Sequence, residues 1–161
     1  MTGFCFLNVF FSTILNPNFR SFINKIVTTY PISQNIIFEI NEMEDYGDTK
    51  VFMQALNFVR ELGIGIAIDD MGKGNSQLQS IIEWKPDYVK LDRYLTKGLN
   101  ESKRKQSIVK LLLGYSQEFG IKVIMEGIET VEELKTAKDL GVYIAQGFAL
   151  GTPERLKTLL R

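Results

Sequence analysis

Two adjacent aspartates, Asp69 and Asp70, end an apolar run, and a stretch with two glycines follows them directly. Neighbouring carboxylates repel each other, and each loses hydration when a strand end is packed into a fold. A divalent cation with oxygen ligands would offset both costs. The alternative is a pair of aspartates that caps a helix or forms a turn in a solvated loop.

Polar side chains also stand at or near the ends of the other apolar runs. They are Asn8, Glu39, Lys90, Asp92, Glu126 and Gln146. In a parallel barrel the carboxyl ends of the strands meet on one face, where the loops build the active site. Helix caps and solvated turns do not readily explain six such residues, so the set favours a metal site.

The candidate ligands are oxygen donors. The chain has no histidine, which excludes histidine acid–base catalysis and histidine-ligated zinc. Magnesium or manganese fits an oxygen-rich site best. Two cations bridged by Asp69 or Asp70 would activate water and hold the oxygens of a phosphoryl displacement. Lys90 would then hold the attacking water or offset charge in the transition state; alternatively, it is a strand-end lysine paired with Asp92.

Six apolar runs predict strands. They cover residues 4–9, 36–40, 65–68, 88–91, 123–125 and 142–145. Helical patterns separate them at residues 19–26, 48–62, 77–84, 101–119 and 131–140, and a last helix is expected after Pro153. This alternation with short connections predicts an α/β fold in which helices cover a parallel sheet that is buried on both faces.

Local signals set the expected helix ends. Pro17 is expected at the first position of a helix, Asp48 at an N-cap and Gly63 at a helix C-terminus. Thr130 and Glu133 have the spacing of a capping box. In the helix expected over 101–119, four apolar residues align: Ile108, Leu111, Leu112 and Tyr115.

Composition indicates an ordinary globular domain. The chain has 161 residues, of which 45% are hydrophobic and 24% are charged. Nineteen basic residues balance nineteen acidic ones, so no general field draws the chain to nucleic acid or to an anionic membrane. Cys5 is the one cysteine, and we expect it to be a buried structural thiol in a reducing cytoplasm. Residues 4–15 are too short to span a bilayer and lack a positive leader, which favours a strand over a signal peptide.

Five motifs occur in a recognisable order. They are Glu39-Ile-Asn-Glu42, Asp69-Asp70-Met-Gly-Lys-Gly-Asn-Ser, Pro86-Asp-Tyr-Val-Lys90-Leu-Asp92-Arg, Glu126-Gly-Ile-Glu129-Thr and Gln146-Gly-Phe. Together they resemble the EAL domain family, the cyclic di-GMP phosphodiesterases of bacterial signalling. The resemblance covers essentially the whole chain. It implies a TIM-type (β/α) barrel and the magnesium- or manganese-dependent hydrolysis of cyclic di-GMP to linear pGpG.

The resemblance also assigns expected roles. The positions that look like metal ligands are Asn8, Glu39, Asp69, Asp70 and Glu126. Those similar to catalytic residues are Lys90, Glu126 and Asp70, with Lys90 positioning the attacking water. The positions that match substrate-lining residues are Asp92, Glu129 and Gln146. Glu42 resembles a glutamate that steadies the loop after the aspartates.

The chain also departs from the family. It contains no Glu-Ala-Leu motif, so the first strand, its helix and one metal-ligand glutamate are expected to be absent. A full barrel typically needs about 250 residues, so residues 1–161 are predicted to form a single truncated EAL domain, an incomplete barrel of about six βα units. In the loop, Met71, Lys73 and Asn75 replace the usual phenylalanine, threonine and tyrosine; Asn41 and Phe10 also stand where other residues are usual.

These departures leave two functional alternatives. One is a cytoplasmic phosphodiesterase of this lineage with weak or no hydrolysis. The other is a non-catalytic module that binds cyclic di-GMP or pairs with a protein through the open barrel edge, with a homodimer as the expected assembly. Neither alternative involves a nucleic acid polymer or a membrane.

Overall fold

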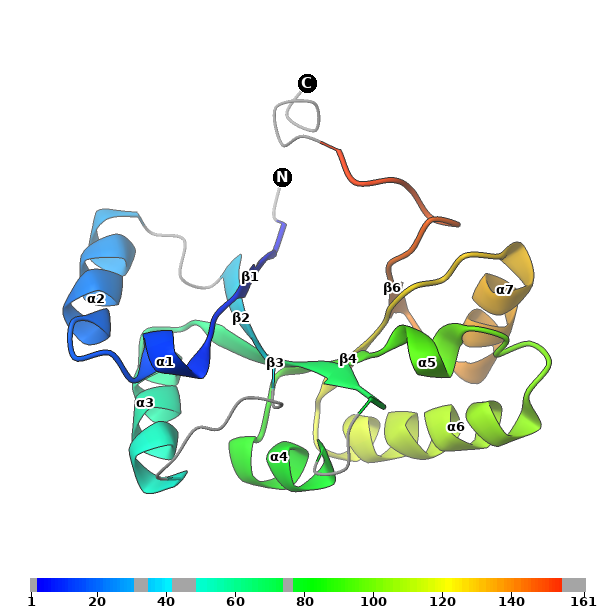
Figure 1. Ribbon diagram of the computed structural model, residues 1–161, viewed down its shortest axis with the longest axis horizontal. Helices are drawn as coiled ribbons and strands as arrows, with labels where there is room; N and C mark the ends of the chain where they lie inside the picture. The colour runs from blue at the N-terminus through cyan, green and yellow to red at the C-terminus, as the bar shows by residue number, and fades with distance from the viewer. Residues whose placement is uncertain (1–2, 31–34, 42–48, 74–76, 155–161) are drawn as a thin grey trace. The chain divides into compact units, whose positions relative to one another are not determined.

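The computed structural model describes residues 3–30, 35–41, 49–73 and 77–154. The chain divides into two compact units, residues 1–90 and 91–161. The elements of each unit alternate between strand and helix along the chain (Figure 1). Each unit is therefore described separately.

In its described residues, the first unit contains four strands and four helices. They are β1 (Cys5–Asn8), α1 (Phe11–Ile14), α2 (Phe19–Thr29), β2 (Ile36–Asn41), α3 (Thr49–Glu61), β3 (Gly65–Met71), α4 (Gln77–Trp84) and β4 (Tyr88–Leu91), the last of which ends at the boundary with the second unit. β1 pairs in parallel with β2, and β2 with β3. The strands lie in the sheet in chain order. Because β1, β2 and β3 are parallel, their carboxyl ends lie at the same end of the sheet.

Three aromatic residues form the centre of the first unit's core. Phe11, Phe52 and Trp84 are almost fully buried, and their rings meet edge to face with centroids 4.6–5.5 Å apart. Such pairs add about 0.5–1.5 kcal/mol each beyond the area that they bury. This cluster fixes α1, α3 and α4 to one another.

The second unit continues the alternation. It contains α5 (Arg93–Thr96), α6 (Lys103–Glu118), β5 (Lys122–Met125), α7 (Val131–Leu140) and β6 (Ile144–Ala145). β5 pairs in parallel with β6, and the N–H of Glu126 donates to the carbonyl of Leu91 at 3.0 Å. The predicted capping box is confirmed, because Thr130 and Glu133 bond reciprocally at the start of α7. The α/β alternation and all six predicted strands are confirmed as well.

Several predicted details are wrong. β1 was expected to be buried, but it is the terminal strand of the sheet, and Cys5 is exposed. α2 begins at Phe19 and not at Pro17, because the short helix α1 and a turn come first. Of the four aligned residues in α6, Leu112 alone is buried, whereas Ile108 and Leu111 are exposed.

Some predictions cannot be compared with the structure. The proposed cap Asp48 and the last helix expected after Pro153 fall on residues 42–48 and 155–161, outside the described part of the chain. Among the described residues, no helix is both long enough and apolar enough to cross a membrane.

Candidate functional site

The strand register of the first unit gathers three of the predicted ligands. Asn8 lies opposite Glu39, and Asn41 lies opposite Asp69, at the carboxyl ends of β1, β2 and β3. Asn8 is exposed, Asp69 is half-buried and Glu39 is buried. A row of carboxylate and amide oxygens therefore runs across this edge of the sheet.

Lys90, on β4, holds two of these carboxylates. Its Nζ lies 2.8 Å from Oε1 of Glu39 and 3.0 Å from Oδ1 of Asp69. Lys90 is 6% exposed and Glu39 is 8% exposed, so solvent screens the contact only weakly. The buried carboxylate of Glu39 and the half-buried carboxylate of Asp69 would otherwise repel each other, and the ammonium compensates both charges.

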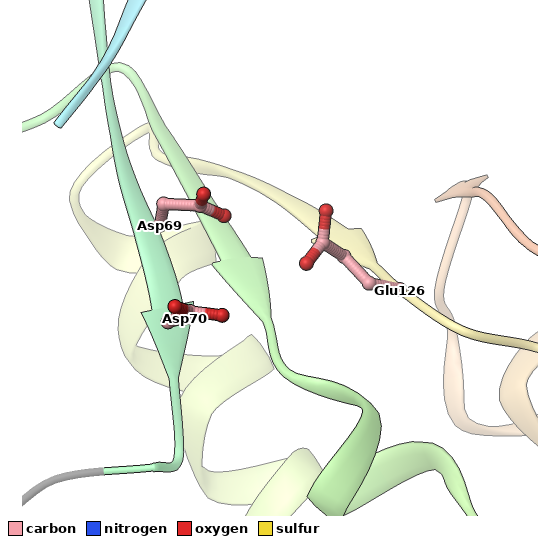
Figure 2. Close-up of side chains that lie close together, drawn as sticks. All are labelled: Asp69, Asp70 and Glu126. Carbon is pink, nitrogen blue, oxygen red and sulfur yellow. The ribbon is translucent and has the colours of Figure 1, made fainter. Parts of the chain in front are cut away.

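Asp70 is placed by an unusual backbone conformation. Successive side chains of a strand normally point to opposite faces, which would separate Asp69 from Asp70. Asp70 instead has a φ of 58°, in the left-handed region that aspartate tolerates better than most residues. Figure 2 shows both carboxylates projecting from the same side of β3. Asn41 donates from Nδ2 to Oδ2 of Asp70 at 2.8 Å and so holds this orientation.

The loop after the aspartates is described only in part. Met71, which ends β3, is 3% exposed and so belongs to the core. Lys73 is an exposed residue with its Nζ 3.7 Å from Asp70. Asn75 lies outside the described residues, as does Glu42, the predicted loop-steadying glutamate.

In the second unit, Glu126 and Gln146 form a pair. Glu126 follows β5 directly (Figure 2), and its Oε1 accepts from Nε2 of Gln146 at 2.7 Å. The main chain also joins the two segments, because the N–H of Gln146 donates at 2.9 Å to the carbonyl of Met125, the residue before Glu126. The two predicted site residues are thus brought into direct contact.

Asp92 and Glu129 have well-defined partners too. Asp92 caps α5 by accepting from the N–H of Tyr94 at 2.7 Å. Glu129 forms an ion pair with Arg93, whose Nη2 lies 2.8 and 2.9 Å from the two carboxylate oxygens of Glu129. Arg93 was not predicted as a site residue, and the only signal for it was its place after Asp92 in the third motif.

A cavity of about 590 Å³ lies beside this ion pair in the second unit. Its lining includes Arg93, Glu129, Gln146, Gly147, Phe148 and Pro153. Phe148 is 68% exposed and offers an aromatic face, whereas Arg93 and Gln146 offer hydrogen-bond donors. A planar, hydrogen-bonding ligand would match this lining.

Glu133 anchors the loop that carries Glu129. Its oxygens accept from the N–H groups of Gly98 at 2.8 Å, Glu129 at 3.0 Å and Thr130 at 3.2 Å. Burial raises the pKa of Glu133, but these backbone bonds and the hydroxyl of Thr130 outweigh burial and hold the pKa below its ordinary value. Glu133 is therefore a positioning carboxylate.

The donor chemistry of the predicted ligands fits a hard divalent cation. Asn8, Glu39, Asp69, Asp70 and Glu126 offer amide and carboxylate oxygens and no nitrogen or sulfur. The first four lie at the carboxyl ends of β1, β2 and β3, and Glu126 follows β5. The residues present are thus the kind that would hold a hard divalent cation.

Comparison with known proteins identifies the family. The family model described as "EAL domain" matches residues 2–153. The cyclic di-GMP phosphodiesterase PA2567 of Pseudomonas aeruginosa is 30% identical over 159 residues, which are 96% of this chain and 27% of that protein. The cyclic di-GMP phosphodiesterase PdeB of Shewanella oneidensis is 32% identical over 124 residues, 77% of this chain and 14% of that protein. The chain thus spans about a quarter or less of the length of these two relatives.

Solved structures have the same fold. The EAL domain of Mycobacterium smegmatis DcpA superposes with a TM-score of 0.90 at 25% identity, over 97% of this chain and 70% of that one. A manganese and cyclic di-GMP complex of Klebsiella pneumoniae BlrP1 superposes with a TM-score of 0.84 at 28% identity, over 91% of this chain and 38% of that one. The predicted fold class, α/β with an incomplete TIM-type barrel, is confirmed. The chain belongs to the EAL domain family.

Proposed function

We propose that residues 1–161 form one cytoplasmic EAL-type signalling domain of the metal-dependent phosphodiesterase lineage, which binds cyclic di-GMP and hydrolyses it weakly or not at all. The observation that carries the proposal is the buried contact of Lys90 with Glu39 and Asp69 at the edge where the strands end. Burying a lysine between two carboxylates costs desolvation free energy, which a purely structural role would not require. Such charge clusters concentrate at functional sites.

Asn8, Glu39, Asp69, Asp70 and Glu126 would hold magnesium or manganese. The cation would supply Lewis acidity and a reactive water. Within the protein, Lys90 would donate a hydrogen bond to the attacking water and balance the charge of the phosphoryl oxygens. Asn41 would keep the carboxylate of Asp70 aimed at the site through its bond at 2.8 Å.

Substrate contacts would come from Asp92, Glu129 and Gln146. Gln146 and Glu129 line the cavity of about 590 Å³, where Phe148 would stack on a guanine and Arg93 would face a phosphate. Glu42 would steady the loop after the aspartates.

The reaction, where it occurs, is a hydrolysis. Water attacks one phosphorus of cyclic di-GMP, the bond from phosphorus to the 3′ oxygen breaks, and the leaving oxygen takes up a proton, which gives pGpG. Met71, Lys73 and Asn75 replace the residues that are usual in the loop after the aspartates, and this loop leads directly from two of the proposed metal ligands. A small misplacement of the reacting groups costs about two orders of magnitude in rate, which is why we expect slow turnover at most.

The test is chromatographic detection of pGpG after incubation with cyclic di-GMP and manganese or magnesium. We expect a trace of pGpG or none, with any product abolished in Lys90→Ala and Asp69→Asn and unchanged in Lys73→Ala. Turnover at an ordinary enzymatic rate of about 1–10 s⁻¹ would overturn the proposal of weak hydrolysis.

A second candidate function is a protein-interaction module. β1 is the terminal strand of the sheet, and Phe4 and Leu7 are 55% and 42% exposed on or beside it. An apolar strand without charged or proline residues at a sheet edge invites pairing with another strand. If this edge forms a homodimer, Leu7→Lys should convert the dimer to a monomer in sedimentation experiments; a dimer that persists in Leu7→Lys would exclude the edge as the interface.

A further inference from the structure

The second unit contains another cavity, which lies away from the proposed cyclic di-GMP site. Its volume is about 500 Å³, within the range that small-molecule sites occupy in proteins. Its walls come from α6, from the residues that begin β5 and β6, and from the end of α7. Glu126 and Gln146 follow the opposite, carboxyl ends of β5 and β6. This cavity, which we call the α6 cavity, therefore shares no residue with the cavity beside Glu129.

One side of α6 forms the longest wall of the α6 cavity. Lys110, Leu113, Gly114 and Gln117 line it. Their positions are i, i+3, i+4 and i+7, the spacing that places side chains along one side of a helix. The buried face of α6 is a different one, formed by Val109, Leu112 and Ser116.

Gly114 keeps this wall open. It lies in the interior of α6, where glycine is among the least favourable residues. Its φ is not positive, and a Cβ at this position would meet no atom within 4 Å. Neither the backbone conformation nor close packing within the described chain therefore requires glycine here. The glycine leaves space beside the helix that a bound molecule would fill.

The charge of the α6 cavity is positive. Among the described residues that line it, two are lysines and none is acidic. Lys122 comes soon after the end of α6, where a cation offsets the partial negative charge of a helix end. Lys110 precedes Glu118 by eight residues, or about 12 Å along the axis, which is beyond the reach of that effect. Lys110 forms no ion pair with any described residue, so an anionic ligand would be its counter-charge.

The other walls offer an aromatic ring and apolar surface. Tyr143 is 96% exposed although it follows the buried Val142, and Ile144 is 40% exposed. Leu113 and Ile121 are half-buried and complete the apolar surface. An aromatic ring on a ligand would cover this surface and pair with the ring of Tyr143.

We propose that the α6 cavity is a second ligand site, which binds a small aromatic phosphate ester. The phosphate would lie beside Lys110 and Lys122, with the amide of Gln117 as a further donor. The aromatic group would lie against Tyr143 in the space that Gly114 leaves. The inference goes beyond the proposed function, because this site needs neither metal nor any residue of the proposed cyclic di-GMP site.

The remaining positively charged cavity of the second unit lacks these features. It has a volume of about 400 Å³, and its basic lining residues are Arg93, Lys97 and Lys105. Arg93 is paired with Glu129, and Lys105 donates to the carbonyls of Tyr94 and Lys97. Two of its three cationic groups are thus already compensated within the chain, which favours the α6 cavity as the anion site.

Nuclear magnetic resonance of the ¹⁵N-labelled whole chain in EDTA tests the site, with 1-naphthyl phosphate as the probe. We expect saturable shifts of the amides of Gly114, Gln117, Lys122 and Tyr143, with a dissociation constant of about 1 mM or tighter. Inorganic phosphate lacks the ring and 1-naphthol lacks the charge, so each should bind at least about tenfold more weakly. No saturable shift up to about 5 mM, or shifts confined to Gln146 and Phe148, would overturn the proposal.

Variants of α6 test whether the cavity itself binds the probe. Gly114→Leu should weaken binding by about tenfold or more, because the new side chain occupies the cavity while leucine favours the helix. Lys110→Met should weaken it by about fivefold or more through loss of the charge. Lys103→Met, which changes an exposed lysine of α6 outside the cavity, should bind within about twofold of wild type. Unchanged binding by Gly114→Leu, or equal losses in Lys103→Met and Lys110→Met, would contradict a site in the α6 cavity.

Discussion

At the scale of single residues, Lys90 is a buried cation that contacts two carboxylates. Its ammonium is 2.8 Å from Glu39 and 3.0 Å from Asp69, and all but 6% of the residue is buried. Desolvation of three charged groups is expensive, and their mutual attraction must offset it. Removing the central charge therefore leaves the buried carboxylate of Glu39 and the half-buried carboxylate of Asp69, which repel each other.

Lys90→Met should destabilise the metal-free protein by about 3 kcal/mol, because it removes the charge and keeps most of the volume. For a domain of this size the melting temperature should fall by about 6–12 °C. Manganese should raise the melting temperature of the variant more than that of wild type, since a cation can take over the compensation of the carboxylates. Thermal unfolding in EDTA and in manganese measures both effects.

Lys73→Met is the matched control, because the side chain of Lys73 is 60% exposed and its nitrogen is 3.7 Å from Asp70. An exposed ion pair of this kind contributes little, so the change should be below about 0.5 kcal/mol. Equal melting temperatures for Lys90→Met and wild type in EDTA would contradict the structural importance of the buried contact.

The sequence predicted which residues stand at the strand ends, but not how they contact one another. Asn8, Glu39 and Asp69 were expected at one edge, and the register confirms this. The contacts of Lys90 depend on side-chain packing between strands that are far apart in the chain. The left-handed conformation of Asp70, with a φ of 58°, carries no clear sequence signal, because aspartate is common in ordinary conformations as well.

At the scale of elements, the start of α7 shows how a cap can order a site. Glu133 collects three backbone N–H donors, and one of these belongs to Glu129, which contacts Arg93. The pKa of Glu133 is lowered because these bonds favour the charged carboxylate. The fold is therefore stabilised by the ionised form of this residue.

Glu133→Gln should show this dependence on pH. Because the folded pKa lies below its ordinary value of 4.5, the stabilisation is fully present above that value and is lost as the pH falls through the folded pKa. The difference in unfolding free energy between wild type and Glu133→Gln should therefore be about 1–3 kcal/mol at about pH 6 and should shrink toward about pH 3. Urea denaturation at a series of pH values measures it.

The control for that series is Glu132→Gln, since Glu132 is an exposed glutamate in the same first turn. Its effect should stay within about 0.5 kcal/mol across the series. A Glu133→Gln difference that grows as the pH falls would have the wrong sign for a lowered pKa and would contradict the assignment.

The loop after β6 depends on a close backbone approach at Gly147. This residue has a φ of 154°, and a Cβ there would overlap the backbone of Ile128. The same loop carries Gln146, whose carbonyl accepts from the N–H of Ile128 at 3.1 Å. Only glycine permits this contact between the two loops that follow β5 and β6.

Gly147→Ala should lower the free energy of unfolding by about 3 kcal/mol or more, because the backbone would have to move. Gly151→Ala is a matched control in the same segment, as nothing lies within 4 Å of its Cβ position, and it should change stability by less than about 1 kcal/mol. Chemical denaturation of both variants gives the comparison, and equal effects would show that the approach at Gly147 is not limiting.

Apolar periodicity predicted the elements better than their burial. Every predicted strand is present, because each is a short apolar run bounded by turn residues. α6 shows where this reasoning fails: its sequence carries two apolar stripes, and periodicity alone does not tell which of them faces the sheet. β1 was misjudged for a similar reason, since an apolar strand reads alike at the centre and at the edge of a sheet.

At the scale of the whole molecule, the chain is a family member that departs from the family pattern. The superposition on the EAL domain of DcpA includes 97% of this chain and 70% of the DcpA chain. The Glu-Ala-Leu motif does not occur in residues 1–161. The shared fold and the strand-end carboxylates support the proposed ligand binding, whereas the altered loop residues Met71 and Lys73 argue for slow chemistry. The proposed site therefore predicts binding of cyclic di-GMP more directly than it predicts hydrolysis.

Isothermal titration of the whole chain with cyclic di-GMP, in manganese and in EDTA, tests the central claim most directly. We expect saturable binding in manganese that weakens by at least about tenfold in EDTA and in Asp69→Asn, because the phosphates lose the charge that holds them. Asp139→Asn, which changes an exposed aspartate of α7, should bind as wild type does. No binding in manganese, or equal binding by wild type and Asp69→Asn, would contradict the proposed metal-dependent cyclic di-GMP site.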